Sequence, residues 1–325
     1  MTFPFNVYLS ALAGAFVMTL ASLPLWRRWC LRTGHVDDPG FRKIHQTPVP
    51  LAGGLAVLTG ILIPLVAALA LIRFHTAGLE SGPLLHGFER RKIELAAILF
   101  GAIAMVALGW WDDQFELRPL PKFSGQIVIA LIVAASGVRA TLFVPNIAFS
   151  FAITVLWILT VINAFNFMDN MNGLCAGLGA IGAFYFGASA AVSGQYLVAL
   201  IALLACGALL GFLPYNFPQA TTFLGDAGSH LIGYLLAVLA ILPHFYSQKS
   251  DLNKFAVLTP LLVLAVPLAD MAWVVMLRTR MGKPFYIGDN NHLSHRLVRM
   301  GLSKTRAVLV IWLLAAMIGA VSFIL

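Results

Sequence analysis

Ten apolar runs separated by polar loops cover most of this 325-residue chain and leave it few folds to adopt. A transmembrane helix needs about 20 apolar residues. Charged residues make up 10% of the chain, whereas soluble domains carry about 25%. The pattern predicts an all-α integral membrane protein with about ten transmembrane helices in one domain, 1–325. The runs lie at roughly 5–25, 51–72, 93–111, 125–138, 148–162, 174–193, 196–213, 228–243, 255–277 and 305–325, the fourth and fifth being short.

Lys and Arg residues are spread unevenly over the two sides that such helices create. Of the 21, 14 fall in the loops after odd-numbered runs or at the start of the last run, and seven on the other side. Because cytoplasmic loops carry the excess of positive charge, we expect the odd-numbered loops to be cytoplasmic and both termini to be extracytoplasmic. The cluster Arg90-Arg91-Lys92 runs against this orientation. The net charge of +8 fits basic loops facing anionic headgroups and phosphates, so we expect no nucleic-acid partner.

The five odd-numbered loops hold seven of the nine aspartates. If the helices alternate in direction, these loops meet at one face of the membrane. Carboxylates close to a bilayer are costly and usually mark function. Acids, amides, histidines and basic residues gathered there suit a metal ion and phosphates. The loops read DDPG at 37–40, WDD at 111–113, NAFNFMD at 163–169, GDAGS at 225–229 and DNNHLSH at 289–295.

Asp112 and Asp113 are adjacent carboxylates at the end of the third run. Adjacent carboxylates repel each other, so they tend to retain a proton or to have a cation beside them. Either state suits proton abstraction or binding through a metal. Lys122, nine residues on, is a candidate for holding a phosphate. A solvated helix end, where Asp-Asp is common, is the alternative.

Asn163, Asn166, Asp169 and Asn172 recur every three residues, a spacing that places them on one face of a helix. Amide and carboxylate oxygens suit a hard cation such as Mg²⁺, and Asn and Asp also hydrogen-bond bases and sugars. N-capping of the sixth run by Asp169 or Asn172 would explain one of these residues but not four. The spacing therefore favours a ligand-binding stripe.

Asp226 lies between two glycines at the start of the eighth run. Glycine lets the backbone approach a ligand closely, and a helix N-terminus attracts anions. The carboxylate can hold a divalent ion that bridges to phosphate. Asn216 enters the same loop. Simple capping of the helix by Asp226 is the alternative.

A short helix with one cationic and one apolar face is predicted over about 292–300. Such a helix can turn its cations toward a diphosphate, or it can be a plain membrane-surface helix. Zinc binding by the histidines is a third reading, although the three cysteines are scattered and offer no ligand spacing. The cationic face holds His292, His295, Arg296 and Arg299. A further basic loop, before the second run, holds Arg42, Lys43 and His45.

Taken in order, these segments resemble the polyprenyl-phosphate N-acetylhexosamine-1-phosphate transferases of glycosyltransferase family 4. The resemblance is to the WecA-like branch, which is related to the phospho-N-acetylmuramoyl-pentapeptide transferases. Each motif is modest alone, but five in order between ten apolar runs are specific. The motifs are RKIHQTPVPLAGG at 42–54, DDQFELRPLPK at 112–122, NAFNFMDNMNGL at 163–174, FLGDAGS at 223–229 and DNNHLSHRL at 289–297.

The resemblance implies an enzyme of the bacterial inner membrane with its site at the cytoplasmic face. Such enzymes transfer a sugar 1-phosphate from a UDP-sugar to undecaprenyl or another polyprenyl phosphate and release UMP. This is the first membrane step in the synthesis of cell-envelope polysaccharides such as lipopolysaccharide O-antigen or cell-wall polymers. The loop at 278–304 fits the WecA-like branch better, so we expect N-acetylglucosamine 1-phosphate. Phospho-N-acetylmuramoyl-pentapeptide transfer, or another UDP-N-acetylhexosamine, is the alternative, and a homodimer is left open.

By motif match, the resemblance also implies roles for single residues. Asn166 and Asp226 would bind Mg²⁺, with Mn²⁺ as the alternative ion. Asp112 would deprotonate or orient the lipid phosphate, with Asp113 beside it. Apolar grooves between the helices would take the prenyl tail, with membrane lipids around them. The residues expected to bind substrate are Arg42, Lys43, His45, Lys122, Asp169, Asn172, Asn216, His292, His295 and Arg296.

The sequence departs from the resembled pattern at two positions. Asn170 stands where an Asn-x-x-Asn-x-x-Asp-Gly motif has glycine, and Ser294 stands where a His-x-His-His motif has its middle histidine. These departures leave the reaction class standing and leave the identity of the sugar open.

A polytopic transporter is the alternative function from a different class of protein. Transporters place polar residues near the bilayer midplane, often with internal repeats. Here the polar residues cluster at the ends of the runs, on one side, and no repeat is apparent. The pattern therefore favours the enzyme.

Overall fold

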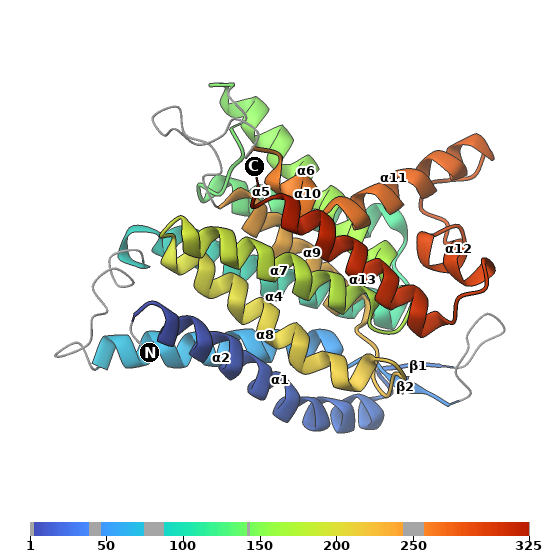
Figure 1. Ribbon diagram of the computed structural model, residues 1–325, viewed down its shortest axis with the longest axis horizontal. Coiled ribbons are helices and arrows are strands. Elements are labelled where there is room, and N and C mark those ends of the chain that lie inside the picture. Colours follow the sequence, from blue (N-terminus) through green and yellow to red (C-terminus); the bar gives the residue numbers. More distant parts are fainter. Residues whose placement is uncertain (1–2, 39–46, 75–87, 142–143, 243–256, 325) are drawn as a thin grey trace.

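Long helices running roughly along one axis form the protein (Figure 1). The computed structural model describes residues 3–38, 47–74, 88–141, 144–242 and 257–324. Two short strands, β1 (Val36–Asp37) and β2 (Val49–Pro50), pair antiparallel and add to the all-α architecture predicted. The helices are α1 (Phe5–Thr33), α2 (Gly53–Phe74), α4 (Lys92–Phe115), α5 (Pro119–Ala135), α6 (Ile147–Met168), α7 (Leu174–Val192), α8 (Tyr196–Asn216), α9 (Gly225–Ile241), α10 (Thr259–Val263), α11 (Ala265–Arg280), α12 (Leu293–Arg299) and α13 (Lys304–Val321).

Seven helices in the described part of the chain are long and apolar enough to cross a membrane, namely α1, α2, α4, α6, α7, α8 and α13. The helices α5 and α9 are apolar but have 17 residues each, at the lower end of the ~17–25 that a span needs. The run expected at 255–277 is divided at Leu264 into α10 and α11. The run expected to be short at 148–162 is the 22-residue α6. The chain is thus a multi-pass helical membrane protein.

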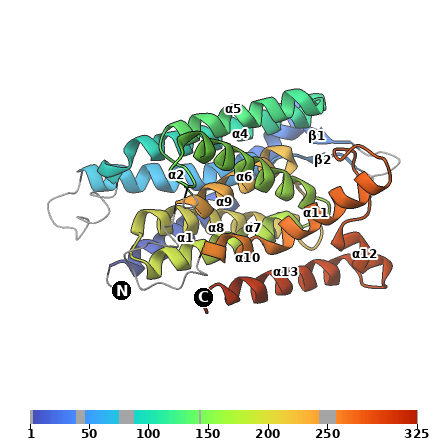
Figure 2. The same ribbon diagram turned by 90° about the horizontal axis from the view of Figure 1, so that it is seen from above.

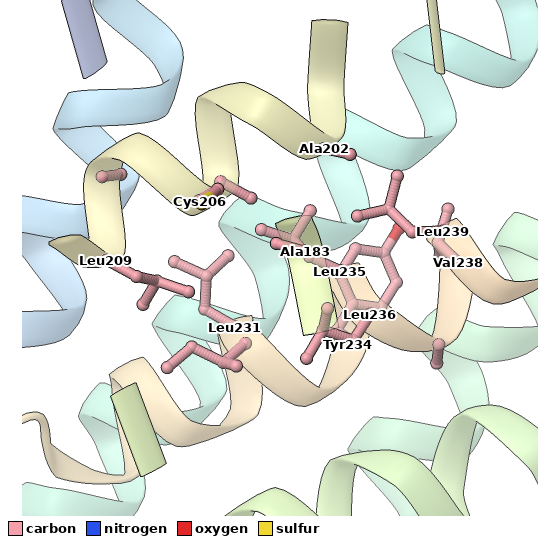
Figure 3. Packing of buried hydrophobic residues seen from close by; sticks show 14 of the residues in the cluster. Ala183, Ala202, Cys206, Leu209, Leu231, Tyr234, Leu235, Leu236, Val238 and Leu239 are labelled. Carbon is pink, nitrogen blue, oxygen red and sulfur yellow. The ribbon is translucent and has the colours of Figure 1, made fainter. Parts of the chain in front are cut away.

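Helix α9 is the centre of the bundle. It packs against α2, α4, α6 and α7, and every residue from Ala227 to Ala240 is buried. Figure 2 shows it between α4 and α5 on one side and α13 on the other. In Figure 3 its leucines meet Ala183 of α7 and Leu209 of α8. A Cβ on Gly54 of α2 would lie 2.5 Å from the backbone nitrogen of Gly228, so small residues let α2 and α9 touch.

The polar loops lie together at one end of the bundle. The strands β1 and β2 and the helix α12 are at this end in both views (Figures 1 and 2), as are the C-terminal ends of α4 and α6 and the start of α9. The first turn of α1 and the last turn of α13 lie at the opposite end. Chain segments far apart in the sequence can therefore supply polar side chains to one site.

Candidate active site

A lysine lies between two carboxylates where α4, α5 and α9 meet. The Nζ of Lys122 is 2.6 Å from Oδ2 of Asp112 and 2.8 Å from Oδ2 of Asp226. The Oδ1 of Asp112 accepts a hydrogen bond from the backbone of Leu117 at 2.9 Å, which fixes that carboxylate. Two carboxylates this close need a cation, the more so because Asp112 is buried. The lysine that the sequence predicts to hold a phosphate therefore also supplies the counter-charge of the two acids.

Asp113 faces a different partner from its neighbour Asp112. Its Oδ1 accepts a hydrogen bond from the backbone N–H of Asp226 at 2.7 Å, and its Oδ2 from that of Ala227 at 3.1 Å. A carboxylate at the first N–H groups of a helix accepts hydrogen bonds from donors that have no partner within the helix. Its negative charge also interacts favourably with the positive end of the helix dipole. Gly225 has a φ of +73°, and a Cβ there would lie 2.6 Å from Asp113. The capping role considered for Asp226 thus belongs to Asp113.

The predicted polar stripe is divided between a helix and a turn. Helix α6 ends at Met168, so Asp169 and Asn172 lie in the turn that follows it. The expectation that all four residues share one helix face is wrong, because the chain leaves the helix at Asp169. On the helix, Asn166 donates through Nδ2 to Oδ1 of Asp226 at 2.6 Å, and Asn163 donates to Gln126 of α5 at 2.9 Å.

His230 belongs to the cluster although the sequence analysis did not select it. One ligand atom each from Asp112, Asp226 and His230 lie within 4.8 Å of one another. The ring is fully buried, and its Nδ1 has no hydrogen-bond partner among the described residues. Its Nε2 is 3.5 Å from Nε2 of Gln126. The signal was the spacing of four residues from Asp226, which puts both side chains on one helix face. Two carboxylates and a buried imidazole nitrogen can hold a divalent cation.

A pocket of about 430 Å³ opens next to Gly225, the residue before Asp226. Its volume is in the range of small-molecule sites, roughly 300–1,000 Å³. Four residues predicted to bind substrate line it, namely Asp169, Asn172, Asn216 and His295. The structure adds further lining residues that the sequence analysis had not assigned to the site, among them Asp37, Asn170, Phe217 and Lys304. The predicted residues Arg42, Lys43 and His45 lie outside the described residues.

Two of the lining amides are engaged in holding the pocket wall. The Oδ1 of Asn216 accepts a hydrogen bond from the backbone of Gly173 at 2.6 Å, and its Nδ2 donates to the carbonyl of Thr222 at 2.9 Å. The Nδ2 of Asn172 donates to the carbonyl of Pro218 at 3.2 Å. These bonds tie the start of α7 to the loop before α9. Asp169, in contrast, is exposed in the pocket.

The predicted cationic face of α12 is divided. The Nδ1 of His292 is 2.6 Å from Oδ2 of Asp270, and the backbone N–H of Leu293 donates to Oδ1 of Asp270, also at 2.6 Å. Asp270, to which the sequence analysis gave no role, therefore anchors the start of α12. The guanidinium of Arg296 lies 5.0 Å from the ring centroid of Trp273. His292 and Arg296 do not line the 430 Å³ pocket, and the side chain from this motif that does is His295.

His295 and Lys304 are the two basic residues of the pocket wall. Burial, followed by the positive charges of His292, Arg299 and Lys304, lowers the pKa of His295 below its ordinary value. The ring is therefore neutral at pH 7 in the free protein. Lys304 was counted only as a topology marker in the sequence, because its place beside the pocket depends on how α13 packs.

The two positions at which the sequence departs from the resembled pattern contact each other. The Oγ of Ser294 donates a hydrogen bond to Oδ1 of Asn170 at 2.7 Å. The contact joins α12 to the turn after α6, across 124 residues of sequence. Asn170 lines the pocket, as does His295, the residue after Ser294.

Comparison with known proteins gives consistent relatives. Residues 95–244 match the model of the family described as glycosyl transferase family 4. A protein of Bacillus subtilis (strain 168) named probable undecaprenyl-phosphate N-acetylglucosaminyl 1-phosphate transferase is 31% identical, over 92% of this chain and 81% of its own. Decaprenyl-phosphate N-acetylglucosaminephosphotransferase of Mycobacterium tuberculosis is 35% identical, over 97% and 80%.

A third relative has a lower sequence identity but aligns over a similar share of both chains. The undecaprenyl-phosphate alpha-N-acetylglucosaminyl 1-phosphate transferase of Salmonella typhi is 28% identical, over 96% of this chain and 82% of its own. The matched family region begins in α4 and includes Asp112, Lys122, Asn166 and Asp226. With similarity that extends along nearly the whole sequence, the chain belongs to glycosyl transferase family 4.

Proposed function

We propose that this protein transfers N-acetylglucosamine 1-phosphate from UDP-N-acetylglucosamine to a polyprenyl phosphate and releases UMP. The observation that carries the proposal is the cluster of Asp112, Lys122 and Asp226 beside a polar pocket, at one end of a membrane-spanning bundle. The relatives named above carry the same reaction in their names. A lipid acceptor in the bilayer and a water-soluble donor can meet only at such a boundary.

The reaction requires two anions to approach each other. A phosphate oxygen of the lipid attacks the phosphorus that bears the sugar, the bond to the UMP oxygen breaks, and UMP leaves with the electron pair. Charge repulsion opposes this approach, and cationic groups lower the barrier. Lys122 offers an ammonium between the carboxylates, Lys304 offers a second one at the pocket, and His295 can become cationic by taking up a proton when the diphosphate binds.

Magnesium is the ion that we propose for the cluster, with manganese as the alternative. Asp226 would hold it through a carboxylate oxygen, and buried His230, whose Nδ1 has no hydrogen-bond partner among the described residues, lies in the same cluster. Asn166 would turn its amide oxygen to the ion or orient Asp226, to which its nitrogen now donates. The bound ion supplies neutralisation of the diphosphate and of the developing charge on UMP.

In this proposal the lipid phosphate binds at Asp112 and the nucleotide-sugar binds in the pocket. Asp112, held by Leu117 and Lys122, would accept a proton from the lipid phosphate or orient it. Asp169, Asn172 and the wall built on Asn216 would surround the nucleotide-sugar. Arg42, Lys43 and His45 would bind substrate from the first loop, and His292 and Arg296, which contact Asp270 and Trp273 of α11, would act from α12.

The site is proposed to lie at the cytoplasmic face of the bacterial inner membrane. The proposal rests on the sequence count of 14 basic residues in the odd-numbered loops or at the start of the last run, against seven elsewhere. It counts α5, α9 and the α10–α11 pair as spans with the seven longer helices, which gives ten spans in one domain and extracytoplasmic termini.

The direct test is an assay of UMP release by the purified protein with undecaprenyl phosphate and UDP-N-acetylglucosamine. We expect release that depends on both substrates and on a divalent cation. UDP-N-acetylgalactosamine and UDP-N-acetylmuramoyl-pentapeptide, tested in parallel, separate the alternative sugars. A protein that transports a nucleotide-sugar into liposomes without releasing UMP would be a transporter, and the proposal would fail.

A further inference from the structure

We propose that Asn170 and Ser294 form a latch that sets the width of the pocket and positions His295 opposite Asp169. The two side chains would act through their neighbours and not by touching substrate. The proposal rests on the proposed function of the pocket as the nucleotide-sugar site. It gives Asn170 and Ser294 a positioning role. Neither the motif match nor the names of the relatives assign a role to these two residues.

The latch connects the two walls of the pocket directly. Asn170 lies in the turn after α6, next to Asp169, and Ser294 lies in α12, next to His295. Asp169 and His295 both line the pocket, and the hydrogen bond of 2.7 Å between Ser294 Oγ and Asn170 Oδ1 lies one residue away from each. Any change in the distance between Asn170 and Ser294 therefore shifts the two lining residues relative to each other.

The polar groups of both latch residues have protein partners. Ser294 is 1% exposed, and its hydroxyl proton is directed to Asn170. The other end of the Asn170 amide is also occupied, because its Nδ2 donates to the carbonyl of Phe167 at 2.7 Å. This second bond locks the amide against the end of α6. The pair is thus built to hold position.

Helix α12 needs such an anchor because it has only seven residues, too few to be stable without tertiary contacts. Its N-terminal residues His292 and Leu293 are fixed to Asp270 of α11, and Arg299 bonds to the carbonyl of Asn290 within the preceding loop. Those bonds hold α12 to α11 and to its own preceding loop, and α12 also packs against α13. Among the described residues, the bond from Ser294 is the hydrogen bond that ties α12 to the turn after α6.

Kinetics of latch variants test the proposal. In Ser294→Ala and in Asn170→Ala, KM for UDP-N-acetylglucosamine should rise roughly three- to tenfold, the effect of one hydrogen bond, with kcat within twofold of wild type. The double variant should be no worse than either single one, because the bond is lost once. Ser294→Thr keeps the hydroxyl and should keep KM near the wild-type value. Ser193→Ala, at the opposite end of the bundle, is the matched control.

Additive effects in the double variant, or an unchanged KM in Ser294→Ala, would overturn the latch. A fall in kcat alone would also overturn it, because that pattern belongs to a residue acting on the reacting atoms. A second measurement does not depend on turnover. Amide hydrogen exchange over 293–299 should be faster in Ser294→Ala than in wild type, in detergent and without substrate. Equal exchange would refute the latch even if the wild-type protein released no UMP.

Discussion

Asp113 at the end of α4 caps the helix that carries Asp226, with hydrogen bonds from the backbone N–H groups of Asp226 and Ala227 at 2.7 and 3.1 Å. Its neighbour Asp112 turns to the side chain of Lys122, 2.6 Å away. Two adjacent carboxylates of the same type thus have separate tasks. One fixes the position of the start of α9, and the other faces the cluster where we place the chemistry.

Substitution of the two aspartates should separate stability from turnover. Asp113→Ala removes a helix cap and should cost about 1–2 kcal/mol of stability, seen as a lower melting temperature in detergent. Asp112→Asn should leave the melting temperature nearly unchanged. A base lost from the reacting centre costs about 10²–10⁴-fold in rate, so Asp112→Asn should slow UMP release far more than Asp113→Asn. The opposite order of rates would move the catalytic role to Asp113.

Lys122→Gln should bind Mn²⁺ more tightly than wild type while turning over more slowly. The Lys122 ammonium now lies between Asp112 and Asp226, so a divalent ion must compete with it. Removing one positive charge between two carboxylates should tighten metal binding by about tenfold or more, and the loss of a phosphate-facing cation should lower kcat. Titration of Mn²⁺ by electron paramagnetic resonance measures the affinity, with Lys122→Arg as the charge-preserving control. Unchanged Mn²⁺ affinity in Lys122→Gln would show that the ion binds elsewhere.

Binding of UDP-N-acetylglucosamine should weaken as the pH rises. Burial and neighbouring positive charges lower the pKa of His295 in the free protein, and a bound diphosphate raises it. The nucleotide-sugar therefore binds with uptake of a proton. The affinity for UDP-N-acetylglucosamine is greatest below the pKa that His295 has in the free protein. It falls as the pH rises from there through the pKa that His295 has in the complex. Calorimetry from pH 5.5 to 8 measures this slope, which His295→Gln should flatten. The same slope in that variant would assign the proton to another group.

Labelling from one side of the membrane should place Ser303 and Ser193 on opposite sides. Ser303 caps α13 at the loop end, and Ser193 ends α7 at the other end. A cysteine at position 193 should react with an impermeant thiol reagent applied from outside, and one at 303 should not. The native cysteines are buried, and a cysteine-free background is the control. The reverse pattern would place the loop end outside, away from a cytosolic donor.

Most of the helix pattern was predictable because hydrophobic runs report directly on membrane helices. The side-chain partners were less accessible to sequence reasoning. The three-residue spacing from Asn163 to Asn172 suggested one helix face, but nothing in that spacing showed that α6 ends at Met168.

Contacts between distant segments were the least predictable part of the site. His230 and Lys304 join it through the packing of α9 and α13. Asp270 lies within the apolar helix α11, and its partner His292 is 22 residues away in sequence. Ser294 and Asn170 were visible as separate departures from a motif, whereas their hydrogen bond exists only in three dimensions.

Formation of the lipid-linked product by wild type and by Asp226→Asn is the decisive measurement for a metal-assisted transferase site at Asp226. Asp226 faces Lys122 and Asn166, and loss of a metal-binding carboxylate removes several kcal/mol of transition-state stabilisation. Mass spectrometry of reactions with undecaprenyl phosphate, UDP-N-acetylglucosamine and Mg²⁺ should find undecaprenyl-diphosphate N-acetylglucosamine for wild type. For Asp226→Asn, folded to the same melting temperature, it should find almost none. Equal product from both proteins would contradict the account.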